Sequence, residues 1–421
     1  MEPSLRASAS ESAAAPELDV RSPAFRADPY PFYHRLRSLD PVSRREERGF
    51  RFWSLTRWED VTAVLRHPRA SVDRPFQPRP APLPPGTDPE TLHPLARALR
   101  ALSRIMLFRD PPDHTRLRRL ANKAFTPRVV ERLRPRIEAR VDELLAPRAA
   151  DGGMDLIADF ATPLPLLVIA ELLGVPVEDY QSLKRWSDDL ALMLDGSIAA
   201  QVAPRAVASA AEFVAYLRAV VRRRRAEPGE DLLSGMLAVQ ERDDSLTEDE
   251  ILGTGVILLA AGHETTTHLI GNGCLALLRH PEQRTRLRRE PGLLPNAVEE
   301  CLRFESPVQA TSRFFREEIE IAGRRIPKGE EVGLFLGAAN RDPAIFPDPD
   351  RFDVAREEAR QHLSFGHGIH FCLGANLARA EGQAALGALL QRFPDLRLAT
   401  DTLEWRPGFL FRGVERLPVR F

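Results

Sequence analysis

The longest uninterrupted pattern of apolar positions runs from residue 248 to residue 280. Thr247 and Glu250 have the Ser/Thr-x-x-Glu spacing of a capping box, and Pro281 cannot continue a helix. Apolar residues lie on most sides of this segment, at positions 251, 252, 256, 258, 259, 269, 275 and 278. A helix of this length measures about 50 Å. We therefore predict one long helix that crosses the hydrophobic core.

Shorter patterns predict the other elements. Apolar spacing predicts helices over residues 28–39, 58–67, 129–145, 164–173, 177–194 and 204–225, and another that begins near residue 110. Alternating apolar and polar residues predict strands over 50–55, 311–315, 319–321 and 332–336. Residues 75–94 contain eight prolines, which excludes a regular helix or a central strand. This segment is either a linker or, as we favour, a loop that covers a substrate pocket.

Composition limits the class of protein and its partners. With 59 basic and 60 acidic residues, the net charge of −1 gives no support to nucleic-acid binding. Residues 1–17 are rich in Ala, Ser and Pro and lack the apolar region of a signal peptide, so we expect a disordered tail. No run reaches the roughly 18 apolar residues of a membrane helix, which predicts a soluble protein without a membrane partner. Cys274, Cys301 and Cys372 lie far apart, which argues against a disulfide framework and favours the cytoplasm.

Candidate chemistry begins with Cys372, in the stretch 365–374. Apolar residues follow it at a roughly helical spacing, so we expect this cysteine at a helix N-terminus, where the pKa of a thiol is lowered. Glycines at 366, 368 and 374 let the backbone turn sharply and approach a flat, bulky group. A thiolate in such a loop suits the axial position of a haem iron. A lone cysteine is more often an inert buried residue, so the rest of the chain has to decide.

The long helix contains a second unusual constellation. Glu264 and Thr265 place a carboxylate beside a hydroxyl in a segment that we expect to be buried, and a buried carboxylate is costly. The alternative for Thr265 is the common bond from a helical threonine to the carbonyl four residues earlier, here that of Ala261. His263 and His268 lie outside this constellation, and we interpret both as ordinary packed or solvated histidines.

Two further pairs have helical spacing. His114 and Arg118 are four residues apart and share a helix face, where such pairs are usually solvated. Glu300 and Arg303 are three apart, which is typical of a surface contact worth a few tenths of a kcal/mol. Neither spacing identifies a site by itself.

Together these motifs resemble those of the cytochrome P-450 family. The similar segments are the haem-binding loop with Phe365, Gly368, His370, Cys372 and Gly374, the oxygen-activating stretch 261–266, and the ExxR pair Glu300 and Arg303. The resemblance spans residues 28–421, with the motifs in the family's order. It implies the fold of the soluble bacterial type, a single mainly α-helical domain over residues 18–421 with a smaller β-rich part. In that fold the haem lies between the long central helix and the cysteine loop.

The resemblance also implies roles for individual residues. Haem b would be the cofactor, with Cys372 as the ligand of its iron. The other cofactor-binding residues would be Ala261 and the four propionate donors His114, Arg118, Arg313 and His370. Thr265 and Glu264 would hold dioxygen and deliver protons to it. Arg351 would complete the buried network of Glu300 and Arg303, which fixes the cysteine loop.

The implied activity is that of a monooxygenase, which inserts one atom of dioxygen into a hydrophobic small molecule by hydroxylation or epoxidation. Residues 192–198, 308–311 and 409–411 are candidate substrate contacts. Nothing resembles a flavin or iron–sulfur domain, so we expect electrons from a separate ferredoxin and ferredoxin reductase. Their docking face would consist of Arg116, Arg119, Lys123 and Arg379. Two alternatives stay open, a peroxide-driven haem-thiolate peroxygenase and a non-catalytic haem sensor.

Overall fold

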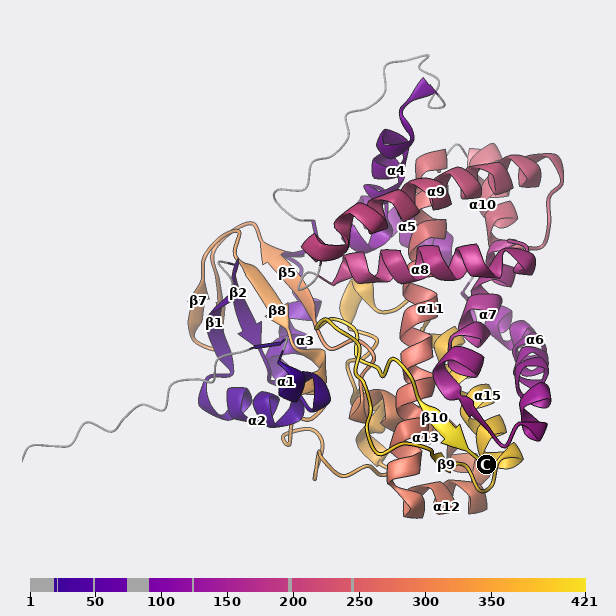
Figure 1. Ribbon diagram of the computed structural model, residues 1–421. Coiled ribbons are helices and arrows are strands. Elements are labelled where there is room, and N and C mark those ends of the chain that lie inside the picture. Colours follow the sequence, from indigo (N-terminus) through magenta and orange to yellow (C-terminus); the bar gives the residue numbers. More distant parts are fainter. Residues whose placement is uncertain are drawn as a thin grey trace, which may run out of the picture.

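The long helix predicted from the sequence is the central element of the structure, a computed structural model. Helix α11 (Glu248–Arg279) has Thr247 as its N-cap, and both halves of the predicted capping box are formed. It runs through the helical part of the molecule, with α8 (Tyr180–Leu194) and α9 (Ala199–Ala226) lying across it near one end (Figure 1). The structure describes residues 19–20, 22–47, 50–73, 91–122, 125–195, 199–243 and 246–421.

The remaining helices surround α11 or support the sheet. They are α1 (Pro23–Ala27), α2 (Tyr30–Leu39), α3 (Trp58–Arg66), α4 (Pro94–Leu102), α5 (Asp113–Asn122), α6 (Pro127–Leu145), α7 (Pro163–Leu173), α10 (Leu232–Asp243), α12 (Pro281–Arg289), α13 (Leu294–Phe304), α14 (Leu336–Ala339) and α15 (Ala375–Arg392). Each helix predicted before residue 195 is confirmed to within a few residues. The start predicted at residue 204 was wrong, because α9 begins five residues earlier and contains Pro204.

Two predicted segments lie mostly or wholly outside the described residues. These are the tail at 1–17 and most of the proline-rich loop at 75–94. In the parts of the chain that the structure describes, no helix combines the length and the hydrophobicity needed to cross a membrane.

Strands form a smaller β-rich part beside the helices (Figure 1). The main sheet has the order β1–β2–β8–β5–β3, formed by β1 (Val42–Glu47), β2 (Phe50–Leu55), β8 (Glu331–Leu334), β5 (Thr311–Phe315) and β3 (Ala70–Ser71). Strands β2 and β8 are parallel, with Trp53 opposite Val332, and the other neighbours are antiparallel. A second sheet joins β4 (Gly153–Asp155), β10 (Pro418–Arg420) and β9 (Arg397–Leu398), and a third joins β6 (Ile319–Ile321) and β7 (Arg324–Ile326).

Glycines let neighbouring elements pack closely against α11. A Cβ at Gly253 would lie 2.5 Å from the carbonyl oxygen of Ala101 in α4, and a Cβ at Gly271 would lie 2.6 Å from Cδ1 of Ile157. Each helical glycine costs about 1 kcal/mol relative to alanine. Packing around α11 offsets this cost, because the main core cluster gathers around it residues from Ala98 to Val419. The sheet has a hydrophobic cluster of its own.

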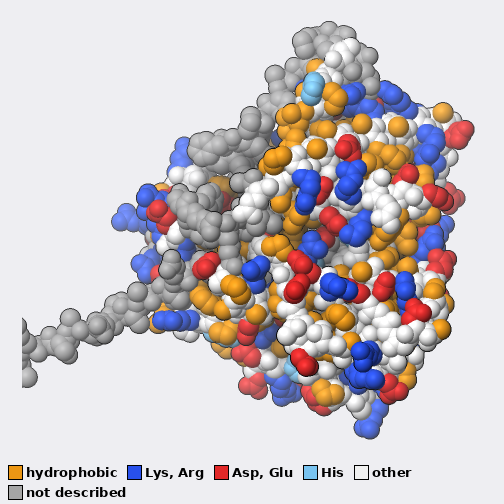
Figure 2. All heavy atoms as spheres, in the orientation of Figure 1, with side chains coloured by type: hydrophobic (Ala, Val, Ile, Leu, Met, Phe, Trp, Pro, Cys, Tyr) orange, Lys and Arg blue, Asp and Glu red, His pale blue; other side chains and the backbone are white. Residues whose placement is uncertain are grey.

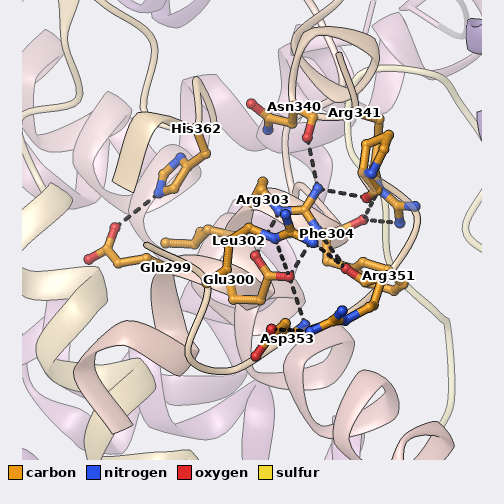
Figure 3. A network of polar contacts seen from close by, with 12 residues as sticks. Glu299, Glu300, Leu302, Arg303, Phe304, Asn340, Arg341, Arg351, Asp353 and His362 are labelled. Atoms are coloured by element: carbon orange, nitrogen blue, oxygen red, sulfur yellow. Dashed lines mark hydrogen bonds and ion pairs between the residues drawn. The ribbon is translucent and has the colours of Figure 1, made fainter. Parts of the chain in front are cut away.

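Helix α13 carries a buried ion pair that holds the segment leading to the cysteine loop. Glu300 and Arg303 have no exposed side-chain surface, and hydrogen bonds of 2.7 and 2.9 Å join the guanidinium to the carboxylate. Arg303 also donates to the carbonyl oxygens of Asn340, Pro349 and Arg351 (Figure 3). A buried pair is stable only when its remaining donors and acceptors find partners, and these carbonyls supply them.

The third charged member of this network is Arg356, and the prediction of Arg351 was wrong. The Arg356 side chain is buried, and its Nε lies 3.3 Å from Oε1 of Glu300. Its guanidinium donates to the carbonyl oxygens of residues 347, 348 and 351. The side chain of Arg351 is 63% exposed and pairs with Asp353, so only its carbonyl belongs to the network. Two arginines lie five positions apart, and the sequence pattern could not tell which one turns inward.

Asn340 connects this network to the cysteine loop. While its carbonyl accepts from Arg303, its side-chain oxygen accepts from the backbone N–H of Leu363 at 2.6 Å and its amide donates to Ser364 at 2.9 Å. Ser364 in turn donates to the carbonyl of Leu302 on α13. The residues just before Phe365 are therefore fixed to helix α13 from two sides.

We predict that Arg356→Leu lowers the free energy of unfolding by about 3–5 kcal/mol, because it leaves part of the buried Glu300 carboxylate without a partner. Arg351→Leu is the matched control, since it removes an arginine that is largely exposed. Its effect should stay within about 0.5 kcal/mol. Urea unfolding followed by circular dichroism measures both. Equal losses for the two variants would contradict the assignment of Arg356 to the network.

Candidate active site

One face of α11 is accessible, although the helix is otherwise buried. Between residues 250 and 277, the positions that are not fully buried are 257, 258, 261, 262 and 265. This spacing places them on one face of a helix. A core helix with a single accessible stripe is suited to line an internal site, and the stripe includes the predicted residues Ala261 and Thr265.

Thr265 forms the hydrogen bond that is common for a helical threonine, to the carbonyl four residues earlier. Its hydroxyl donates to the carbonyl oxygen of Ala261 at 2.7 Å. At Gly262, beside this bond, a Cβ would only touch Ile169 at an ordinary contact distance of 3.4 Å. Close packing thus requires a glycine at positions 253 and 271 but not at Gly262. Because Gly262 has no side chain, the backbone of the accessible face is uncovered there.

Glu264 lies on a buried side of α11, and its carboxylate has two cationic or polar partners. The side chain of Glu264 is 3% exposed, and its Oε1 lies 3.1 Å from Nε2 of His268 and 2.9 Å from the guanidinium of Arg406. Burial would raise the pKa of this carboxyl, but His268, Arg406 and His263 outweigh it and hold the pKa well below its usual value. Of the two readings that the sequence allowed for His268, packed or solvated, the structure shows the packed one, and sequence spacing of four residues gave the only sign of its contact with Glu264.

The cysteine loop makes two sharp turns before Cys372. Gly366 and Gly368 have positive φ angles of 68° and 71°, and a Cβ at Gly368 would overlap the carbonyl oxygen of Leu65. The backbone N–H of Cys372 donates to the carbonyl oxygen of Phe365 at 2.9 Å, which closes the loop. Cys372 itself is partly exposed and lies three residues before the first residue of α15, close to the predicted position.

The predicted lowering of the Cys372 pKa was wrong for the thiol without a ligand. Burial raises its pKa, and this effect outweighs the backbone N–H of Gly374 and the charges of Arg118 and Arg379, which lower it. A bound metal cation would favour the thiolate, since a coordinating thiol is deprotonated outright. The helix N-terminus and the two arginines reduce the cost of that step.

The four predicted propionate donors come together from three elements: α5, β5 and the cysteine loop. The rings of His114 and His370 have centroids 4.1 Å apart. Burial, followed by the neighbouring His114, Arg313 and Arg118, lowers the pKa of His370 to about 3. Burial also lowers the pKa of Arg313 to about 10. The four residues that the resemblance grouped thus lie near one another in the structure.

This cluster of donors has no carboxylate partner among the described residues. Arg313 is 5% exposed, yet it donates only to the hydroxyl of Thr311 and the carbonyl of Ser312. Arg118 bonds only to the amide of Asn122, and the buried Nε2 of His114 has no partner in the described chain. A buried cation without an anion is costly. The cluster fits a ligand that carries carboxylates, and two propionates are what haem b presents beside its iron.

Glu299 links helix α13 to the two segments that flank the cysteine loop. Its carboxylate accepts from Arg379 at 2.6 and 3.0 Å and lies 3.0 Å from Nε2 of the buried His362. The Arg379 guanidinium lies over the ring of Phe365, 4.6 Å from its centroid. Sequence reasoning missed Glu299 and His362, although an acid directly before the ExxR pair and a histidine three positions before Phe365 were visible signals.

The segments predicted to contact substrate also meet, as far as they are described. Val308 pairs with Phe411 in an isolated bridge, and Gln309 donates its backbone N–H to the carbonyl of Leu410 at 2.8 Å. Asp195 accepts from the backbone N–H groups of residues 409 and 410, each at 2.7 Å. The ends of three segments far apart in the sequence thus converge, whereas residues 196–198 lie outside the described part.

Comparisons with known proteins identify the same family over nearly the whole chain. A sequence model described as Cytochrome P450 matches residues 92–402. The chain is 42% identical to the Biotin biosynthesis cytochrome P450 of Bacillus subtilis (strain 168), covering 95% of this chain and 98% of the relative. It is 46% identical to Cytochrome P450 107B1 of Saccharopolyspora erythraea, covering 96% and 98%.

Solved structures agree with this fold. The structure of P450BioI in complex with hexadec-9Z-enoic acid ligated acyl carrier protein matches with a TM-score of 0.86 and 42% identity, over 95% of this chain and 100% of that chain. The structure of CalO2 matches with a TM-score of 0.86 and 40% identity, over 96% and 98%. The chain therefore belongs to the cytochrome P450 family and is a haem b monooxygenase of the bacterial type, an oxidoreductase.

Proposed function

We propose that this P450 inserts one atom of dioxygen into an elongated hydrophobic molecule, using electrons from a separate ferredoxin and ferredoxin reductase. The observation that carries the proposal is the cluster of four buried or half-buried donors beside Cys372, which has no carboxylate partner among the described residues, together with the accessible face of α11. When bound there, haem b supplies the reductive activation of dioxygen, which a thiolate ligand promotes. The cytoplasmic setting stays a prediction from the cysteine spacing.

Cys372 is the proposed iron ligand. Its loop is fixed by the hydrogen bond to Phe365 and by the network that ends at Ser364. The backbone N–H of Gly374 and the charge of Arg118 stabilise negative charge on the sulfur. The proposed propionate donors, which have no carboxylate partner among the described residues, would gain charge-assisted hydrogen bonds to the haem propionates. Such bonds are roughly twice as strong as neutral ones.

Thr265 and Glu264 are the proposed proton-delivery residues. The Thr265 hydroxyl lies on the accessible face and is held by the carbonyl of Ala261, so a small rotation frees it to donate to dioxygen. Glu264 precedes it on the buried side and is kept ionised by its partners. We propose that the two act in sequence, with the carboxylate receiving protons and the hydroxyl presenting them.

The substrate class follows from the segments that converge near residues 308–311 and 409–411. These segments carry mostly apolar side chains, and Phe409 packs against Phe25 and Phe335. One relative is crystallised with hexadec-9Z-enoic acid on acyl carrier protein, and another with myristic acid. We infer that long-chain acyl compounds are the best first candidates for this chain.

We predict that hexadec-9Z-enoic acid changes the haem absorption spectrum on titration, and that the affinity for fatty acids falls as their chain is shortened. Each buried methylene contributes about 0.8 kcal/mol. Dodecanoic acid, four carbons shorter, should therefore bind about 200-fold more weakly if the whole chain is buried. Spectral titration of the haem-loaded protein gives both dissociation constants. Equal affinity for the two acids would contradict an elongated apolar pocket.

We predict that Thr265→Ala diverts electrons from product to hydrogen peroxide. The variant lacks the hydroxyl that presents protons, so the share of electrons found in product should fall by an order of magnitude or more. Peroxide, product and consumed reductant are measured together, with Thr265→Ser as the control that keeps the hydroxyl. A haem sensor would show no turnover to divert. Turnover with peroxide alone, at the rate of the reduced system, would indicate a peroxygenase instead.

The electron donor would dock beside the cysteine loop. Ile369 and Phe371 on this loop are 53% and 39% exposed, which is unusual for large apolar side chains. Among the predicted docking residues, Arg119 is exposed, whereas Arg116 pairs with Glu250 and Arg379 with Glu299. Lys123 lies outside the described residues. Figure 2 shows basic and acidic side chains interspersed over the face it presents, so an acidic ferredoxin would need a local basic contact.

We predict that Arg119→Glu slows reduction by ferredoxin about tenfold at low ionic strength, because it places like charges in contact. The difference should shrink as salt screens it. Arg289→Glu on α12 is the matched control, since that arginine is also exposed. Stopped-flow reduction at several salt concentrations measures both variants. If Arg119→Glu is reduced at the wild-type rate at every salt concentration, Arg119 does not belong to the docking face.

A further inference from the structure

Helix α8 ends on a buried carboxylate. Asp195 is the C-cap of this helix and is 2% exposed. A negative charge at a helix C-terminus faces the negative end of the helix dipole, so the end of α8 does not itself favour an aspartate here. The apolar residues 192–194 of the last turn are only partly buried. A charge that is buried more deeply than its apolar neighbours requires a partner outside the helix.

The partner of this carboxylate is the turn of residues 408–411 in the C-terminal segment. One oxygen of Asp195, Oδ2, accepts from the backbone N–H groups of Phe409 and Leu410, each at 2.7 Å. Consecutive backbone N–H groups that point at one anion form a compact anion site. Hydrogen bonds to a carboxylate are also stronger than those between neutral groups. The two bonds therefore join the end of α8 to a turn that lies 214 residues further along the chain.

A neighbouring segment holds the same turn through other backbone groups. Gly408 begins the turn with a φ of 102°, which residues with a side chain rarely adopt. The carbonyl oxygen of Leu410 accepts from the backbone N–H of Gln309 at 2.8 Å, and Phe411 pairs with Val308 in a β-bridge. The attachment to α8 depends on one side chain, whereas this second attachment uses backbone groups. A substitution at position 195 therefore releases only the first.

The attached turn carries apolar side chains at the candidate substrate contacts. Residues 409–411 are partly exposed, as are residues 192–194, so both segments that the carboxylate joins present accessible apolar side chains. Helix α8 is in turn fixed to α11, since the hydroxyl of Ser187 donates to the carbonyl oxygen of Leu259 at 3.2 Å. Position 258, next to this carbonyl, belongs to the accessible stripe of α11. The turn, the end of α8 and the accessible face of α11 are thus positioned together.

We propose that Asp195 is a positioning residue that sets the selectivity of this P450 for long apolar chains. Its carboxylate holds the turn of residues 408–411 against the end of α8, and the held turn packs on the part of a long chain that a shorter chain does not reach. Because the turn is ordered on folding, its ordering costs nothing when substrate binds. Without the two hydrogen bonds the turn moves, and a long chain loses contacts that a short chain never makes. This inference rests on the proposed function, because it concerns the same substrate site.

The first test is the ratio of the dissociation constants of hexadec-9Z-enoic acid and dodecanoic acid, measured by spectral titration of the haem-loaded protein. The wild type should discriminate between the two acids about 200-fold. If the released turn leaves two of the four additional carbons exposed, Asp195→Ala should lower this ratio to about 15-fold, with the loss confined to the longer acid. Asp195→Asn keeps an oxygen that can accept both N–H groups, so its ratio should lie closer to that of the wild type.

Two further variants separate the turn from the general effect of losing a buried acid. Asp189→Ala is the matched control, because Asp189 is a buried acid on the same helix whose carboxylate contacts Arg205 and Ser209 on α9. Its ratio should equal that of the wild type. Gly408→Ala disturbs the turn and leaves the carboxylate in place, so it should lower the ratio as Asp195→Ala does.

Hydrogen–deuterium exchange tests the attachment of the turn without any substrate. Loss of a hydrogen bond to a carboxylate should make the amides of residues 409 and 410 exchange about 10- to 100-fold faster in Asp195→Ala. In the control Asp189→Ala, these two amides should exchange at the wild-type rate.

The outcomes separate this inference from the proposed function. Unchanged exchange in Asp195→Ala, faster exchange with the selectivity of the wild type, or an equal loss of selectivity in Asp189→Ala would each overturn the role of Asp195 and leave the proposed function intact. A wild-type protein whose haem spectrum no hydrophobic probe changes would overturn the proposed function, and this inference with it.

Discussion

The ion pair between Glu300 and Arg303 is the constraint on which the rest of the site depends. Neither side chain touches water, so each must find every partner inside the protein. The partners are mainly backbone carbonyls of residues 340–351, and this requirement fixes a segment that has little regular secondary structure. Asn340 then fixes Leu363 and Ser364, and the next residue begins the cysteine loop. A single buried charge pair thus positions a sulfur 69 residues further along the chain than Arg303.

The site itself follows a second electrostatic rule. Around the Glu300 pair the protein satisfies each buried charge internally, whereas around His114 and Arg313 it does not. An unpaired buried arginine destabilises the chain alone, but it makes a ligand with carboxylates a stabilising partner. On the proposed assignment of these donors to the haem propionates, haem binding and folding stability are coupled through them. Burial likewise raises the pKa of the Cys372 thiol, and a bound metal cation would favour its thiolate.

Sequence reasoning succeeded where the deciding forces are local. The capping box at Thr247 and the proline at 281 defined the ends of α11, because both act within one turn of the helix. The cysteine loop was recognisable because its glycines are required by positive φ angles and by contact with Leu65. It failed where two similar residues compete for one distant partner. Arg351 and Arg356 differ only in which of them reaches Glu300, and that depends on the path of the intervening backbone.

His268 illustrates the same limit from the other direction. Its distance of four residues from Glu264 permitted a contact but could not establish one, since most histidines at this spacing are solvated. Gly413 packs against His268 and Arg406 contacts Glu264, and both come from a segment more than 130 residues away. These distant contacts decide that His268 lies against Glu264. The imidazole and the guanidinium then both contact the same oxygen of the buried acid. The side of α11 that faces away from the accessible stripe therefore holds a buried charge that residues of a distant segment help to stabilise.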